Sequence, residues 1–187
     1  MPFKDRHKQR NWTRQRRELG LCVQCVNPVT DSHLRCADCL AQRKKHRKDR
    51  SAYAASIGNC TDCFTRQALP HHALCTVCYL RQTSRNHFGT GAFWQHLQEM
   101  FVSQNATCAL TGFPLTLGLN AEVDHIQPLN KGGERDISNT QWVLGVVNRM
   151  KEDMDEKEFF ALVQTLYLHM SPTKDIERTW DQPVFRV

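Results

Sequence analysis

The chain has 187 residues, which is enough for one ordinary domain with small modules attached but not for two large hydrophobic cores. No stretch approaches the roughly 20 apolar residues of a membrane helix, and the basic N-terminus lacks the apolar segment of a signal peptide. We therefore expect a cytoplasmic protein without an export signal. The net charge of +6 is uneven, with +9 over residues 1–50, +2 over 51–91 and −5 over 92–187.

The basic first half favours a polyanionic partner, because cations that neutralise phosphates release condensed counterions from nucleic acid. A solvated tail is the alternative interpretation. Residues 1–20 form a basic arm in which arginines surround Trp12, and such a mixture could lie along a groove of DNA. Residue types alone do not separate base contacts from phosphate contacts. The predicted DNA-binding residues of the arm are Arg10, Arg14, Arg16 and Arg17.

Eight of the nine cysteines fall into four CxxC pairs. Ten residues separate the first two pairs, eleven separate the second two, and the second set repeats the first at an offset of 38 to 39 residues. Four thiolates in two close pairs can surround Zn²⁺ with no open position, which is typical of a structural site. The two predicted zinc sites are Cys22, Cys25, Cys36 and Cys39, and Cys60, Cys63, Cys75 and Cys78.

Other uses of these cysteines fit less well. Disulfides are rare in reducing cytosol, a redox CxxC needs no second pair at a matched distance, and no pair is followed by the histidine of a haem attachment motif. A zinc deaminase needs H-x-E, and "LPHHALCTVC" lacks that glutamate. Each module is too small for its own core, so metal should contribute on the order of 10 kcal/mol to its folding. His33, His71 and His72 are expected to be bystanders.

Helices are predicted after the second pair of each module, at residues 39–56 and 78–88. The first is crowded with like charges, which destabilise an isolated helix at i,i+4 spacing and which phosphate contact would relieve. Its predicted DNA-binding residues are Arg43, Lys44, Lys45, Arg47, Lys48 and Arg50. Gly89 and Gly91 then indicate a linker.

Residues 92–105 carry apolar side chains at helical spacing and predict an amphipathic helix. The next stretch is interrupted by glycine and proline, consistent with a short hairpin that leads into a strand ending near His125. Cys108 has no CxxC partner and is expected to be a buried thiol. A long loop then precedes a strand at 140–144 and a helix that carries Asn148 and Lys151.

The order of strand, loop, strand and helix resembles the HNH endonuclease family over about residues 105–155. The motifs "CALTG", "VDHIQP", "GG", "ISNTQWV" and "VNRMK" carry the resemblance in that order, and "DEKEFFALVQTLYLHM" is similar to the closing helix of phage-type and free-standing homing members. The resemblance implies an α+β fold with a small ββα-metal nuclease core and flanking helices. Two tandem four-cysteine zinc-binding modules precede that core.

The resemblance also implies the site roles. Asp124 and Asn148 would hold one divalent cation, His125 would be the general base, Asn139 would brace the loop and the His125 backbone, and Lys151 would lie near the phosphate. Phosphodiester hydrolysis independently needs an activated water and a cation that stabilises the phosphate oxygens. Carboxylate and amide oxygens suit Mg²⁺ or Mn²⁺.

Two glycines give the loop its expected shape. Gly132 and Gly133 would let the backbone turn back, so that Asn139 reaches under His125. Two features depart from the family pattern: many HNH members carry a second histidine where Asn148 stands, and many have a zinc knuckle around the core itself, where only Cys108 remains here.

The function implied by the resemblance is a metal-dependent, site-directed DNA endonuclease that acts on double-stranded DNA and leaves 5′-phosphate and 3′-hydroxyl ends. The tandem modules look most like a homing-type or phage-borne nuclease, with a restriction enzyme as a further option. One active site cuts one strand, so a double-strand break needs a homodimer or two successive cuts. The alternative class is a non-catalytic zinc-knuckle nucleic-acid-binding protein that keeps the HNH-like region as a scaffold.

The predicted organisation has five parts. The C-terminal tail carries Trp180 and Phe185 in a polar setting, and it could dock on the core or on a second subunit. The parts are a basic arm at 1–20, a zinc module with its basic helix at 21–56, a second zinc module at 57–90, a nuclease domain at 91–170 and the tail at 171–187.

Overall fold

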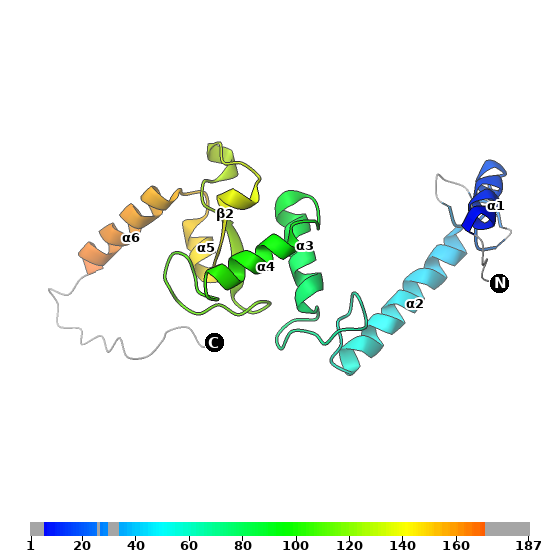
Figure 1. Ribbon diagram of the computed structural model, residues 1–187, viewed down its shortest axis with the longest axis horizontal. Coiled ribbons are helices and arrows are strands. Elements are labelled where there is room, and N and C mark those ends of the chain that lie inside the picture. Colours follow the sequence, from blue (N-terminus) through cyan, green and yellow to red (C-terminus); the bar gives the residue numbers. More distant parts are fainter. Residues whose placement is uncertain (1–5, 26, 30–33, 171–187) are drawn as a thin grey trace. The chain divides into compact units, whose positions relative to one another are not determined.

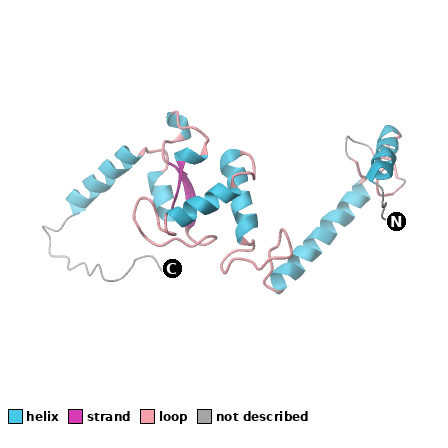
Figure 2. Cartoon of the chain, in the orientation of Figure 1, coloured by secondary structure: helices cyan, strands magenta, loops and turns pink. Residues whose placement is uncertain are grey.

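The computed structural model describes residues 6–25, 27–29 and 34–170. The chain divides into two compact units, residues 1–64 and 65–187. The described residues contain helices and one two-stranded sheet, joined by loops, which agrees with the predicted α+β class (Figures 1 and 2). The predicted tail lies outside the described residues, and so does His33.

Among its described residues, the first unit contains two helices, α1 (Arg6–Glu18) and α2 (Ala37–Ser56). Helix α2 begins two residues before the stretch predicted for it, and α1 is a helix that the sequence reasoning did not propose. The buried cluster between them consists of Cys22, Cys36 and Cys39, with Val29 packed against it. Cysteine side chains therefore form the centre of this module, as expected for a unit too small for an apolar core.

The second unit has an ordinary apolar core. Helices α3 (Thr76–Phe88) and α4 (Trp94–Ser103) pack with the sheet around Trp142, which is fully buried. The indole Nε1 of Trp142 donates to the carbonyl oxygen of Leu97 over 2.9 Å, and the ring meets Phe101 edge-on at 5.6 Å. Burial of one such side chain stabilises the fold by about 1.5–3 kcal/mol.

The sheet pairs β1 (Ala121–His125) with β2 (Thr140–Leu144) in antiparallel fashion. Strand β2 has the bounds predicted from the sequence. Val123 lies opposite Trp142 on the core side, whereas Glu122 and Asp124 share the other face and contact α5 (Gly145–Lys151). The hairpin predicted before β1 is reduced to one isolated bridge between Thr107 and Pro114.

The connection between the strands contains two short 3₁₀ turns, η1 (Leu129–Lys131) and η2 (Ile137–Asn139). Gly132 has φ +84°, a backbone conformation that side chains disfavour. A Cβ on Gly133 would lie 2.0 Å from the carbonyl oxygen of Gln127, so only glycine fits there. The sequence interpretation of these glycines as turn-formers is therefore confirmed.

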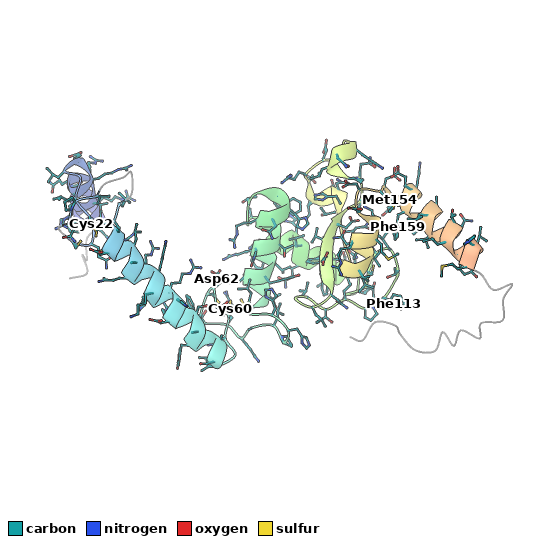
Figure 3. All side chains as sticks on the ribbon, turned by 180° about the vertical axis from the view of Figure 1, so that it is seen from behind. Cys22, Cys60, Asp62, Phe113, Met154 and Phe159 are labelled. Carbon is teal, nitrogen blue, oxygen red and sulfur yellow. The ribbon has the colours of Figure 1, made fainter. Side chains whose placement is uncertain are left out.

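Helix α6 (Glu156–Met170) closes the described chain and begins with a capping box. The backbone N–H of Asp155 donates to the Glu158 carboxylate, and the N–H of Glu158 donates to the Asp155 carboxylate, each over 2.9 Å. Phe159 anchors this end in the core, close to Met154 (Figure 3). Among the helices that the structure describes, none is both long and apolar enough to cross a bilayer.

Candidate functional site

The two predicted cysteine sets each come together in space. Within each set of four, the sulfur atoms lie within 4.8 Å of one another. In the first set, Sγ of Cys25 is 3.5 Å from Sγ of Cys36 and 3.5 Å from Sγ of Cys39. A tetrahedron with Zn–S bonds of about 2.3 Å has sulfur–sulfur edges of about 3.8 Å. Both clusters could therefore hold structural Zn²⁺, and the predicted grouping of the eight cysteines is confirmed.

The two clusters are built in the same way from local structure. Cys36 directly precedes α2 and Cys39 lies in its first turn, while Cys75 and Cys78 have the same relation to α3. The N-terminus of a helix carries partial positive charge, which favours thiolates there. The sequence repeat is thus a repeat of one construction, in which the second CxxC pair starts a helix.

Hydrogen bonding divides the thiols of the first cluster into two kinds. Burial acts to raise the pKa of Cys22, but backbone N–H groups of Cys36, Gln24 and Cys25 outweigh it and lower the pKa to about 6. The hydrogen bond with Cys25, together with burial, raises the pKa of Cys39 to about 12. A metal ion that binds all four must displace protons, so its affinity should fall at low pH.

One of the predicted DNA-binding arginines is used inside the protein. Nη1 of Arg16 donates to the carbonyl oxygens of Cys22, over 2.9 Å, and of Cys25, over 2.5 Å. The guanidinium of Arg16 also lies over the Trp12 ring, 4.3 Å from its centroid. Arg16 therefore fastens α1 to the backbone of the first cluster, and Trp12 packs on this arginine.

Two cations of α2 are also engaged within the first unit. Arg47 pairs with Asp62 over 3.1 Å, and the guanidinium of Arg50 lies 4.4 Å from the centroid of the Phe64 ring. Figure 3 labels Asp62, which follows Cys60 by two residues. The remaining predicted DNA-binding residues are exposed: Arg10, Arg14, Arg17, Arg43, Lys44, Lys45 and Lys48.

Asp124 and Lys151 form a buried ion pair. Nζ of Lys151 donates to Oδ1 of Asp124 over 3.1 Å and to the carbonyl oxygen of His125 over 2.9 Å. Gln141 donates to the other carboxylate oxygen of Asp124 over 3.1 Å. Asp124 is 5% exposed and Lys151 is fully buried. The ammonium of Lys151 therefore contacts the interior, and the expected contact with a bound phosphate does not fit this position.

Asn148 has a different carboxylate as its partner. Its Nδ2 donates to Oε2 of Glu122 over 3.0 Å, and Arg149 donates to Oε1 of the same side chain over 3.1 Å. Asn148 therefore pairs with Glu122, whereas the carboxylate of Asp124, its expected partner at the cation, is hydrogen-bonded by Lys151 and Gln141. A carboxylate and an amide oxygen suit a hard cation such as Mg²⁺ or Mn²⁺, and in this structure the amide nitrogen of Asn148 is the atom that faces Glu122. Glu122 and Asn148 could hold such a cation if the amide of Asn148 turned its oxygen toward the ion.

His125 lies at the end of β1 and is half-buried. Burial lowers its pKa, although the Asp124 carboxylate opposes that effect. Its Nε2 atom is covered and has no hydrogen-bond partner in the described part of the chain. The ring of His87, from the last turn of α3, lies 5.5 Å from the His125 ring. Burial and the neighbouring His125 also lower the pKa of His87.

A pocket of about 380 Å³ lies beside these groups, between α3, β1 and α5. His87, Glu122 and Asn148 line it together with His72 and Tyr79. The sequence did not indicate a site role for His87, because 38 residues separate it from His125. Glu122 was missed although a signal was present, since Glu122 and Asp124 are two residues apart and therefore share one face of the strand.

Asn139 makes the contacts expected of a loop brace. Its Oδ1 accepts from the Gln127 N–H over 2.8 Å, and its Nδ2 donates to the carbonyl oxygens of Gln127 and Glu134. Its own carbonyl oxygen accepts from the Ile126 N–H over 3.0 Å. These bonds hold the chain directly after His125, while Lys151 holds the carbonyl oxygen of His125 itself.

No family model matches the chain, and no curated protein matches it. The class that the fold and the sites define is therefore an α+β chain with two four-cysteine clusters arranged for metal binding. The resemblance to HNH endonucleases depends on the motifs alone and stays a hypothesis.

Proposed function

We propose that the chain is an HNH-type DNA endonuclease that uses Mg²⁺ or Mn²⁺ to hydrolyse phosphodiester bonds, with two structural zinc modules that help to hold the DNA. One observation carries the proposal: His87, whose ring centroid lies 5.5 Å from that of His125, lines a pocket together with Glu122 and Asn148. An imidazole beside a pocket that presents a carboxylate and an amide supplies the kinds of group that this hydrolysis needs.

The proposed base is His125. Its lowered pKa keeps the imidazole neutral at neutral pH, so that it can accept a proton from water. Glu122 and Asn148 would hold the divalent cation, which when bound supplies positive charge to the phosphate oxygens. Lys151 and Asn139 are positioning residues, because they fix the peptide unit that follows His125 and do not line the pocket.

The basic helices supply the affinity for DNA in this proposal. The exposed cations of α1 and α2 would bind the phosphate backbone of double-stranded DNA. We further propose a homing or phage-type role, in which a homodimer or two successive nicks make a double-strand break. The proposed setting is the cytoplasm, for a prokaryotic or phage-encoded protein.

Plasmid cleavage by the zinc-loaded protein tests the activity. We expect Mg²⁺ to convert supercoiled plasmid to nicked or linear DNA, and His125→Ala to lower the rate by at least about 100-fold, the lower range for a lost general base. Omission of Mg²⁺, rather than a chelator that would also remove zinc, is the control. If the wild type binds DNA and never cuts it in Mg²⁺ or Mn²⁺, the endonuclease proposal is wrong.

A glycine substitution tests the role of Glu122 without replacing it. A Cβ at Gly145 would lie 2.4 Å from Oε1 of Glu122, the flexible end of that side chain, so Gly145→Ala should displace the carboxylate and leave the fold intact. We expect cleavage to need a higher Mg²⁺ concentration. Gly91→Ala is the matched control, because its Cβ would meet neighbours only at 3.5 Å or more. If both variants need the same Mg²⁺ concentration for cleavage, Glu122 is not a ligand of the cation.

A non-catalytic nucleic-acid-binding protein is the second candidate. The observation that favours it is the buried Lys151–Asp124 pair, which keeps the carboxylate next to His125 from a bound cation. The burial of the Nε2 atom of His125 also favours the non-catalytic candidate, because a covered nitrogen cannot accept a proton from water. In that case, DNA binding would survive in full when His125, Glu122 and Asn148 are replaced, and no condition would produce cleavage.

A further inference from the structure

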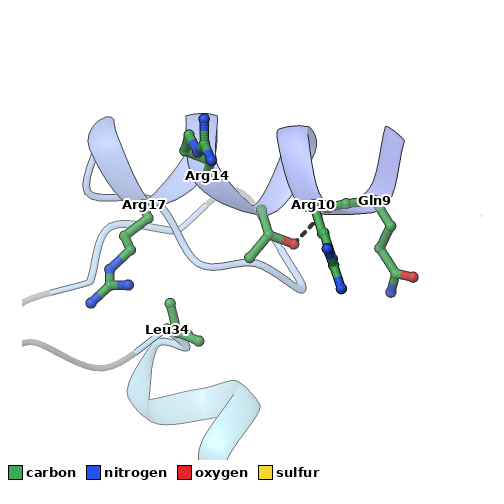
Figure 4. A pocket seen from close by; sticks show the side chains of 6 residues that line it. Gln9, Arg10, Arg14, Arg17 and Leu34 are labelled. Carbon is green, nitrogen blue, oxygen red and sulfur yellow. Dashed lines mark hydrogen bonds between the residues drawn. The ribbon is translucent and has the colours of Figure 1, made fainter. Parts of the chain in front are cut away.

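Three arginines of α1 lie along one exposed face of that helix. Arg10, Arg14 and Arg17 have i, i+4 and i+7 spacing, so they project from the same side. Together with Gln9, Thr13 and Leu34 they line a pocket of about 600 Å³ (Figure 4). In Figure 4, Arg10 and Arg17 extend to the side of the helix where Leu34 lies.

The opposite side of α1 is turned toward the metal cluster. Trp12 and Arg16 are partly buried there, and Arg16 donates to the carbonyl oxygens of two cysteines of the first zinc site. The backbone N–H of Leu21 also donates to the carbonyl oxygen of Arg16 over 2.8 Å. The folded zinc module therefore fixes which face of α1 is presented to solvent.

The arginine face is suited to a ligand with regularly spaced negative charges. Within the described residues, no carboxylate forms an ion pair with Arg10, Arg14 or Arg17. Seven helical residues rise about 10 Å, which is close to the rise of three nucleotides in one DNA strand, at about 3.4 Å each. Guanidinium groups also match phosphate oxygens in a bidentate geometry.

We propose that Arg10, Arg14 and Arg17 form a clamp on the phosphate backbone of DNA, and that Arg16 is the positioning residue that holds this clamp on the first zinc module. The proposal rests on the DNA-binding role proposed above and divides its arginines into two kinds. Arg10, Arg14 and Arg17 contact phosphate, and Arg16 contacts only the protein. The clamp gives affinity without sequence preference, because phosphates carry no base information.

Salt-dependent binding tests the clamp. The zinc-loaded full chain is titrated, without Mg²⁺, against a fluorescent duplex of random sequence at several salt concentrations. Each lost phosphate contact should lower the slope of log K against log [salt] by about 0.9, so R10Q/R14Q/R17Q should lower it by up to about 2.7 and weaken binding more than tenfold. Lys157→Gln, which removes an exposed cation from α6, is the control and should change binding less than twofold.

Hydrogen exchange of the free protein tests the role of Arg16. Arg16→Gln should speed amide exchange across α1 and weaken DNA binding although the three clamp arginines remain, whereas Arg10→Gln should leave exchange unchanged. Bound zinc is measured in every variant to show that the cluster persists. Faster exchange in both variants, or in neither, would contradict the positioning role.

The outcomes separate this inference from the proposed function. If the wild type binds DNA and the triple variant binds it equally well with an unchanged slope, the clamp is wrong while the DNA-binding role stands on α2. A wild type that binds no duplex overturns both. Poly-glutamate, added as a competitor of the duplex, separates phosphate from carboxylate ligands. If poly-glutamate does not displace the duplex from the wild type, the arginines bind phosphate. If the three arginines are needed for binding of poly-glutamate but not for binding of the duplex, the partner is an acidic protein and the clamp on DNA is wrong.

Discussion

The two units of this chain obtain their stability from different sources. In the first, the buried cluster consists of Cys22, Cys36 and Cys39, with Cys25 and Val29 packed against it. In the second, Trp142, Leu80 and Leu97 are fully buried in a continuous apolar core. Metal can replace an apolar core because four metal–thiolate bonds in a small volume offset the entropy of ordering a short chain.

The charges follow the same division. Residues 1–50 carry +9, mostly on exposed side chains of α1 and α2, whereas residues 92–187 carry −5. In the second unit, several acidic groups have partners within the fold: Asp124 pairs with Lys151, Glu122 with Arg149 and Glu158 with Lys131. Most cations of α1 and α2 are therefore exposed and available to a ligand, whereas these three carboxylates of the second unit are paired within the fold.

Loss of the first metal site should have the largest effect. Cys22→Ser should reduce bound zinc from two ions to one and remove a stabilisation on the order of 10 kcal/mol, so that α1 and residues 20–25 lose amide protection. The Trp142 hydrogen bonds should remain protected. Cys108→Ser is the matched control, since Cys108 lies outside both clusters. Hydrogen exchange with metal analysis measures both, and loss of protection throughout the chain would show that the units do not differ in this way.

Removal of the buried lysine should destabilise the second unit by about 3–5 kcal/mol, because Lys151→Met leaves the Asp124 charge buried without its partner. The double variant Lys151→Met/Asp124→Leu should regain most of that loss, because neither charge then remains. Denaturant unfolding of the wild type, both single variants and the double variant gives the coupling. Additive losses would mean that the two side chains do not interact.

The pH profile of cleavage should reflect the burial of His125. Because the imidazole must be neutral to act as base and its pKa lies below 6.5, the rate should hold until the pH falls through that lowered pKa. Arg135 contributes to the lowering, so Arg135→Gln should move this acidic limb to higher pH. Lys157→Gln should leave the limb in place. A limb above pH 6.5 in the wild type would contradict the role of burial.

The surface pair between Arg47 and Asp62 should have the smallest effect. Both side chains are largely exposed, at 72% and 45%, so Asp62→Asn should change the free energy of unfolding by no more than about 1 kcal/mol. DNA affinity should stay equal or rise slightly, because Arg47 is released to face solvent. A loss of zinc from the second cluster in this variant would show that the pair has a larger structural role.

Much of the architecture could be predicted from local sequence. Strand β2 and the helices α2, α3, α4 and α6 lie within two residues of their predicted bounds, because hydrophobic period and turn residues act over short distances. The resemblance to HNH endonucleases implied the bracing role of Asn139, and Gly132 and Gly133 were predicted as the turn of the same loop. Helix α1 was missed, since its arginine-rich sequence has no apolar stripe and depends on Arg16 for its attachment.

What the sequence determined by itself is the set of metal-binding cysteines, because four thiols in two matched CxxC pairs have few other uses and lie close along the chain. Only the tertiary structure decided which carboxylate faces which partner on α5. Alternation places Glu122 and Asp124 on one face of β1, but the pairing of Glu122 with Asn148 and of Asp124 with Lys151 depends on how a helix 26 or 27 residues away packs on that face. The contact of His87 with His125 has the same origin, since packing and not sequence spacing brings the two rings together.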